Sequence, residues 1–86
     1  MQYLYHQDPG HGWLQVRREE LERLGLLSRI TSCSYQRGEW VFLEEDLDMG
    51  LFLEAKESLG EPVELVSRHV ETTPIRSYPP FSAERD

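Results

Sequence analysis

Residues 32–60, SCSYQRGEWVFLEEDLDMGLFLEAKESLG, carry the two strongest structural signals of the chain. The first half predicts a β-hairpin with strands over 32–36 and 39–44, because two short runs suited to strands flank a turn. Arg37 and Gly38 form that turn, where glycine supplies the positive φ that tight hairpins require. The second half has the longer repeat of apolar residues that is typical of a helix.

The second strand of this hairpin is apolar on both faces. Trp40 and Phe42 point to one side, and Val41 and Leu43 point to the other. A strand with one solvated face would alternate apolar and polar residues. We therefore expect residues 39–44 to lie near the centre of the sheet, or to be covered on both sides.

The helix that follows is predicted over 46–59 and ends at Gly60, a typical C-terminal stop. Its apolar stripe consists of residues that recur at helical spacing, and Phe52 flanks it. Met49 and Leu53 fall off the stripe. The stripe residues are Leu47, Leu51, Ala55 and Leu59.

The remaining chain predicts a strand over 13–16, a short helix over 17–25 and a last strand over 62–70. The order β-α-β-β-α-β indicates an α+β fold, with a small antiparallel sheet, a central hairpin, one main helix and one short helix. This order matches a split βαβ, ferredoxin-like layout. The expected core contains Trp40 or Val41, Phe42 or Leu43, Leu47, Leu51 and Leu65.

With 86 residues the chain is long enough for one domain, which we place at 1–70. Residues 71–86, ETTPIRSYPPFSAERD, contain three prolines and no periodicity, so they predict an extended tail. Tyr78 and Phe81 are the expected anchors of this tail, either on the domain or on a neighbouring molecule.

Several classes of protein are excluded by composition. The apolar content of 38% is too high for a disordered chain, yet no apolar run approaches the roughly 20 residues that span a bilayer. The N-terminus lacks the basic and apolar regions of a signal peptide. Cys33, the single cysteine, excludes an internal disulfide. Together these features predict a soluble cytoplasmic protein.

The negative charge is concentrated in one region. Residues 39–64 contain nine of the 16 acidic residues but only one of the nine lysines and arginines, Lys56. Direct binding to DNA or RNA needs basic side chains for the phosphates, so nucleic acid is a poor candidate ligand. A basic protein surface is the expected partner.

A calcium site is the first chemical alternative. Asp46, Asp48 and Glu57 occupy positions 1, 3 and 12 of an EF-hand loop, but Gly50 is one position early, where an oxygen ligand should be. The apolar stripe also indicates helix here. We therefore favour Asp46 as the N-cap and Asp48 in the first turn, where carboxylates favour the helix dipole.

Zinc and enzymatic activity have weaker signals. His6, Asp8 and His11 lie close together, but only His69 and Cys33 remain as further zinc ligands, far along the chain. A Pro-Gly turn with solvated histidines is favoured over zinc. Cys33 has no surrounding nucleophile motif and is expected to be a small core residue of the hairpin. The sequence predicts no enzyme, no metal and no cofactor.

Three stretches resemble proteins of one family. DPGHGWL (8–14), SYQRGEWVFLEED (34–46) and PIRSYPPF (74–81) are similar to a family of small acidic proteins of phages, prophages and plasmids. Anti-CRISPR proteins are the best-known class of small acidic inhibitors from such elements, and several resemble DNA in surface charge. The resemblance therefore implies an inhibitor of host defence.

The resulting hypothesis is a non-enzymatic, DNA-mimicking inhibitor of a basic nucleic-acid-binding complex, with a type I CRISPR surveillance complex as the expected target. The alternative is an accessory or structural module of a mobile element that binds a partner through surplus apolar residues (Trp13, Trp40, Leu53, Tyr78, Phe81). The expected partner-binding residues of the inhibitor are Glu44, Glu45, Asp46, Asp48, Glu54 and Glu57.

Overall fold

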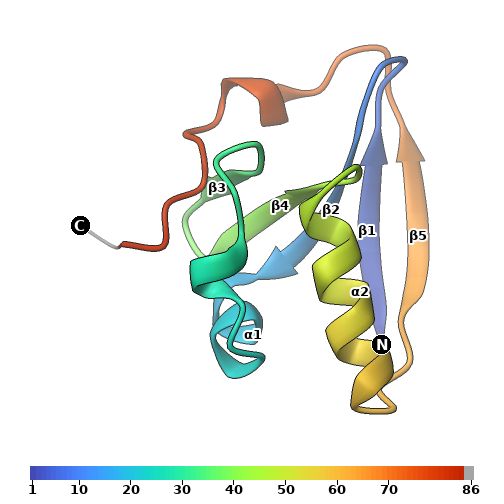
Figure 1. Cartoon of the computed structure of the whole chain (residues 1–86). Helices are drawn as coiled ribbons and strands as arrows, with labels where there is room; N and C mark the ends of the chain where they lie inside the picture. Colours follow the sequence, from blue (N-terminus) through green and yellow to red (C-terminus); the bar gives the residue numbers. More distant parts are fainter. Residues whose placement is uncertain (85–86) are drawn as a thin grey trace.

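A computed structural model describes residues 1–84 and consists of one five-stranded sheet with helices against one face (Figure 1). The α+β class predicted from the sequence is confirmed. The elements follow the order β1 (Gln2–Gln7), β2 (Gly12–Arg17), α1 (Arg18–Arg23), a 3-10 turn (Leu27–Arg29), β3 (Tyr35–Arg37), β4 (Trp40–Glu44), α2 (Asp48–Ser58), β5 (Glu64–His69) and a second 3-10 turn (Pro74–Ser77).

The strands lie in the order β3-β4-β2-β1-β5. Three neighbouring pairs are antiparallel, but β1 and β5 run parallel, so the sheet is mixed and not wholly antiparallel as expected. The split βαβ layout is present, because β4 lies between β2 and β3 and is antiparallel to both.

The strand β1 was not predicted. It forms a hairpin with β2 around a turn that the Asp8 carboxylate holds together. This carboxylate accepts hydrogen bonds from the backbone N–H groups of Gly10 (3.0 Å) and His11 (2.9 Å). At the start of β2, a side chain on Gly12 would run into the Tyr5 hydroxyl, so only glycine fits there.

The main core lies between the sheet and α2. Leu14, Val16, Val41 and Leu43 point from β2 and β4 toward the helix, and Phe52 from α2 packs among them fully buried. Val41, Phe42 and Leu43 are core as predicted, whereas Trp40 is only half-buried.

The buried face of α2 is not the predicted stripe. Leu47 and Leu59 are more than half exposed, and Leu51 and Ala55 are only partly buried. The helix is rotated by about one residue, so that the residues at 48, 49, 52 and 56 face the sheet. Phe52 occupies the central position of this face, where its large ring is fully buried. The ring makes an edge-on contact with that of Tyr3, with the ring centroids 5.3 Å apart.

The opposite face of the sheet has a second, smaller core. Trp13 and Phe42 are buried there against Ile75 from the C-terminal segment. This segment crosses the sheet after β5 and continues along β3, as Figure 1 shows in orange and red. The tail predicted over 71–86 therefore packs on the domain itself; residues 85 and 86 lie outside the described residues.

The tail also covers the outer edge of β3. The Gln36 N–H donates to the Pro79 carbonyl (2.9 Å), and the Phe81 N–H donates to the Ser34 carbonyl (2.8 Å). Phe81 is buried and Tyr78 is half-buried, so both predicted anchors contact the domain.

Three smaller expectations are wrong. The strand β3 is shorter than predicted, and Cys33 lies exposed in the turn before it instead of in the core. Leu65 in β5 is 41% exposed, because α2 covers the centre of the sheet and does not reach its β5 edge.

Candidate functional site

Four of the six carboxylates expected to bind a partner lie on the surface around α2. Glu45 and Asp46 are exposed in the turn before the helix, and Glu54 and Glu57 are exposed on the helix itself. Glu54 and Glu57 follow Gly50 at helical spacing along the face that points away from the sheet. The helix of 11 residues presents them along a rod about 16 Å long.

Asp48 is not part of this surface, because its side chain is 1% exposed. One carboxylate oxygen accepts three hydrogen bonds, from the Thr31 N–H (3.0 Å), the Thr31 hydroxyl (2.8 Å) and the Ser34 hydroxyl (2.6 Å). The Ser34 hydroxyl in turn accepts from the Glu44 N–H (3.0 Å). Asp48 therefore ties the loop before β3 to the start of α2, and its role here is structural.

Asp46 does not cap α2 as the sequence suggested, and Glu44 instead closes the turn before the helix. Its carboxylate accepts from the N–H groups of Asp46 (3.0 Å) and Leu47 (3.1 Å) in the turn that leads into α2. Leu47 occupies the N-cap position and makes no side-chain cap bond. Glu44 is half-buried, and its register opposite Trp13 places it on the far side of the sheet from the helix.

Glu45 links the acidic turn to the sheet, because its carboxylate accepts a hydrogen bond from the Tyr5 hydroxyl. Burial and this acidic partner raise the pKa of Tyr5 to about 12, so the phenol keeps its proton and remains a donor. Glu45 is thus held in place while its exposed side still faces solvent.

Lys56, the only base of the acidic segment, is removed from the surface. It is 3% exposed, and its ammonium lies 2.6 Å from Glu20 of α1 and 2.8 Å from Glu61 after α2. Burial alone would lower the pKa of Lys56, but the bonds to these two carboxylates outweigh it and raise the pKa. The ammonium also lies 5.6 Å from the ring centroid of Tyr3 and 5.8 Å from that of Phe52, within the range of cation–π attraction.

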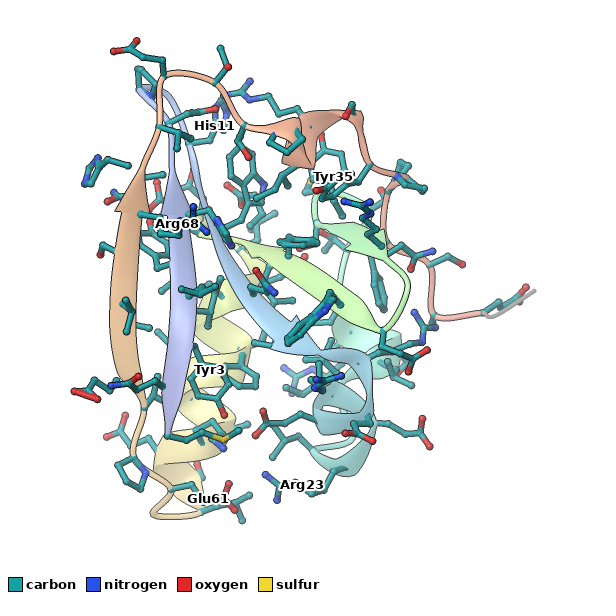
Figure 2. All side chains as sticks on the ribbon, turned by 180° about the vertical axis from the view of Figure 1, so that it is seen from behind. Tyr3, His11, Arg23, Tyr35, Glu61 and Arg68 are labelled. Atoms are coloured by element: carbon teal, nitrogen blue, oxygen red, sulfur yellow. The ribbon has the colours of Figure 1, made fainter. Side chains whose placement is uncertain are left out.

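Glu61 completes a small ionic cluster between the two helices. It also binds Arg23 of α1 at 2.8 Å, and Figure 2 shows these two side chains facing each other below the sheet. The Arg23 and Lys56 partners lower the pKa of Glu61 to about 2. The cluster neutralises Lys56 internally, so the ammonium does not offset the exposed carboxylates of α2.

The opposite face of the sheet carries arginines as well as carboxylates. Arg17 and Arg37 lie over the rings of Trp40 (4.3 Å) and Tyr78 (5.2 Å), and Arg68 of β5 lies on the same face in Figure 2. Beside them is a groove of about 620 Å³ between the sheet and the tail, lined among others by His6, Phe42, Tyr78, Arg37 and Arg68. Glu39 contributes a carboxylate to this groove.

The structure does not contain the EF-hand loop considered above. Its third and twelfth positions, Asp48 and Glu57, both belong to α2, and their side chains lie on opposite sides of the helix. The histidines are engaged elsewhere, since His6 Nε2 contacts the Gln15 amide (2.7 Å) and His11 Nδ1 contacts Arg76 (2.6 Å). Within residues 1–84, no three His, Cys, Asp or Glu side chains are grouped to hold a metal ion.

Most of the apolar residues that were expected to bind a partner pack within the fold instead. Trp13 and Phe81 are buried, and Leu53 is partly covered, which leaves Trp40 and Tyr78 as aromatic rings accessible beside the groove. The aromatic lining of that groove was not predicted, because it depends on the tail folding back over the sheet. A period-two pattern in the hairpin was its only sequence signal.

In the part of the chain that the structure describes, no helix has the length and apolar character to cross a bilayer. Comparisons with protein-family models, with curated proteins and with solved structures give no significant match to this chain.

Proposed function

We propose that this protein is a non-enzymatic inhibitor that binds a basic, DNA-binding surface of a host defence complex in the bacterial cytoplasm. The observation that carries the proposal is the outer surface of α2 and of the turn before it, where Glu45, Asp46, Glu54 and Glu57 are exposed. Lys56, the single base of residues 39–64, is buried and paired with Glu20 and Glu61.

The spacing of the carboxylates supports mimicry of a phosphate backbone. Glu54 and Glu57 are three residues apart, which corresponds to about 4.5 Å along the helix axis. Duplex DNA presents one phosphate per 3.4 Å on each strand, so the two patterns are comparable in density. Arg17, Arg37 and Arg68 lie on the opposite face of the sheet, away from these carboxylates.

Electrostatic recognition of this kind predicts a strong dependence on salt. Charges that pair across an interface steer association, and they are screened as the ionic strength rises. The expected target is a type I CRISPR surveillance complex, and its DNA-binding groove is the expected site. Inhibition requires no catalytic residue and no metal, because occupying the groove is sufficient.

The test is the double reversal Glu54→Lys with Glu57→Lys. Binding to the purified surveillance complex is measured by displacement of labelled target DNA at several salt concentrations. We expect the reversal to weaken binding at least ~10-fold, since charges that face each other would then repel. The thermal melt should change little, because exposed charges contribute little to stability.

The matched control is Glu19→Lys with Glu22→Lys. Both residues are exposed on α1 with the same three-residue spacing, so the change in net charge is identical. The control should retain most of the binding. Equal loss in both variants would indicate an effect of net charge only, and full binding by the α2 variant would contradict mimicry.

The groove favours a second candidate, the accessory module of a mobile element. Trp40 and Tyr78 are half-buried there beside Arg37 and Arg68, a lining suited to a peptide with aromatic and acidic side chains. Tyr78→Ala with Arg37→Ala would abolish capture of such a partner while the α2 double reversal leaves it intact. The opposite pattern supports the inhibitor.

A further inference from the structure

The two edges of the sheet differ in whether another segment of the chain covers them. The β3 edge is closed by the tail, whereas β5 ends the sheet on the other side and pairs only with β1 among the described residues. All six residues of β5 are exposed, and its register with β1 runs over Glu64–His69 without a bulge. No proline interrupts the strand and no described segment covers it, so two of the usual protections of an open edge are missing.

The backbone N–H and C=O groups of β5 that are not bonded to β1 belong to its odd-numbered residues. The Glu64 N–H donates to the Met1 carbonyl (3.0 Å), and the Val70 N–H donates to the Gln7 carbonyl (3.0 Å). Because the direction of the backbone groups alternates along a strand, Leu65, Ser67 and His69 point theirs away from β1. A second strand could therefore pair with β5 at these positions.

We infer that β5 is a dimerisation edge, at which two copies of this chain pair antiparallel to form a continuous ten-stranded sheet. This inference goes beyond the proposed function and does not depend on it. A second copy is the occupant that fits, because the charges of the strand are self-complementary. Glu64, Val66 and Arg68 lie on the face away from α2. The negative Glu64 precedes Val66 by two residues, and the positive Arg68 follows it by two.

The charges select one register. A two-fold axis through Val66, perpendicular to the sheet, places Glu64 opposite Arg68 of the second copy and Leu65 opposite Ser67. The charged pairs then occupy the narrow, non-hydrogen-bonded positions, where side chains approach most closely. Centring the axis on Ser67 would put Arg68 opposite Val66, which offers no charge partner. The Arg68 guanidinium forms no hydrogen bond or ion pair with any other side chain of residues 1–84, so it is available.

The same register covers exposed apolar surface. Leu65, Val66 and Val70 are 38–41% exposed in the single chain. Val70 of one copy comes opposite Pro62 of the other, beside a groove of about 470 Å³ between α2 and residues 60–63, which precede β5. Since the axis is perpendicular to the sheet, both α2 helices lie on the same face of the dimer, and their carboxylates form one larger acidic surface.

The first test is sedimentation equilibrium from about 10 µM to 1 mM, the range in which modest interfaces associate. We expect a concentration-dependent dimer. Ser67→Pro should abolish it, because proline removes an outward N–H at the centre of the edge. The bonds between β5 and β1 stay intact, as edge strands tolerate proline at outward positions. Circular dichroism checks the fold, and an unchanged dimer in this variant overturns the proposal.

The second test exchanges charges and needs no backbone change. Arg68→Glu places like charges opposite each other twice in the dimer, so we expect its dissociation constant to rise ~10-fold or more. Arg68→Glu combined with Glu64→Arg restores opposite charges and should recover the affinity. Arg29→Glu, at an exposed arginine of the first 3-10 turn, is the matched control and should leave the dimer unchanged. Failure of the swap to recover affinity contradicts the register.

Amide hydrogen exchange provides a residue-level readout. The N–H groups of Val66 and Arg68 face β1 and should be protected at every concentration. The N–H groups of Leu65, Ser67 and His69 should become protected only as the concentration rises. A chain that stays monomeric up to ~1 mM, with these three amides exchanging freely, would refute the dimer and leave the acidic-surface proposal untouched.

Discussion

The two edges of the sheet differ in what protects them. At β3, the C-terminal tail supplies backbone partners for Ser34 and Gln36 and buries Phe81 beside them. At β5, no described segment covers the strand, and all of its residues remain exposed. The described part of the tail, residues 71–84, has no regular structure of its own beyond one 3-10 turn, yet it stabilises an edge as a sixth strand would.

The difference shows how an 86-residue chain divides its limited core. A small domain buries a modest fraction of its surface, so each added apolar contact matters. The tail adds Ile75 to the second core and Phe81 to the main one. We therefore expect substitutions at the β3 edge to destabilise the protein far more than substitutions at the β5 edge.

The largest effect is expected for Phe81→Ala. Phe81 is 5% exposed and contacts the main core, and removal of a buried phenylalanine side chain costs about 3–5 kcal/mol. Urea denaturation followed by tryptophan fluorescence measures the loss. Ser82→Ala, at the exposed neighbouring position, should cost less than about 0.5 kcal/mol. A loss of similar size in both variants would show that the tail does not pack as described.

A smaller effect is expected for Arg18→Met. The Arg18 guanidinium is buried and donates to the carbonyls of Ser82 (2.9 Å) and Ala83 (2.8 Å), which fixes the end of the tail. Methionine keeps the aliphatic packing but loses these bonds, at a cost of about 1–2 kcal/mol, because the exposed carbonyls can bind water instead. Proteolysis within residues 71–84 should accelerate. Arg29→Met is the control that should leave the tail resistant.

The arrangement of α2 illustrates what the sequence could and could not predict. Its length and its end at Gly60 follow from local signals, and Gly60 has the positive φ (67°) that ends helices. The orientation of α2 about its own axis does not follow from local signals, because a lysine such as Lys56 is expected to face solvent. The lysine can face inward only because Glu20 and Glu61, from two other segments, meet its ammonium.

The missed strand β1 had a readable signal. Tyr3 and Tyr5 alternate with polar residues before a turn, as in a half-buried strand. The parallel pairing of β1 with β5 depends on contacts more than 60 residues apart, for which the sequence carries no local pattern. The same limit applies to the tail, whose prolines indicated an extended segment but not the edge it covers.

The candidate site was predictable in composition and less so in detail. The exposed carboxylates of α2 follow from the count of acids and bases. Asp48 and Glu44 could not be separated from them, because their roles depend on partners brought by the fold. Asp48 is buried by Thr31 and Ser34, and Glu44 bonds the turn before the helix.

The free energy of unfolding depends on pH through Glu61, which lies between α2 and β5. Its pKa is lowered from 4.5 to about 2 by Arg23 and Lys56, so the carboxylate stabilises the fold fully above pH ~5 and loses this contribution as the pH falls toward 2. Glu61→Gln should give a flatter decrease of the free energy of unfolding over that range. Glu57→Gln, which removes an unpaired exposed carboxylate, should retain the wild-type slope. Equal slopes in all three proteins would contradict the ionic cluster.

The smallest effect is expected at the open edge itself, for Leu65→Thr. Leu65 is 41% exposed, and threonine preserves the preference for a strand, so the monomer should lose less than about 1 kcal/mol. Denaturation at low protein concentration measures this value. At concentrations where β5 pairs with a second copy, the wild type gains stability by mass action that the variant does not share, and the difference should grow. A large loss that is independent of concentration would mean that another part of the chain covers β5, and the contrast between the two edges would then fail.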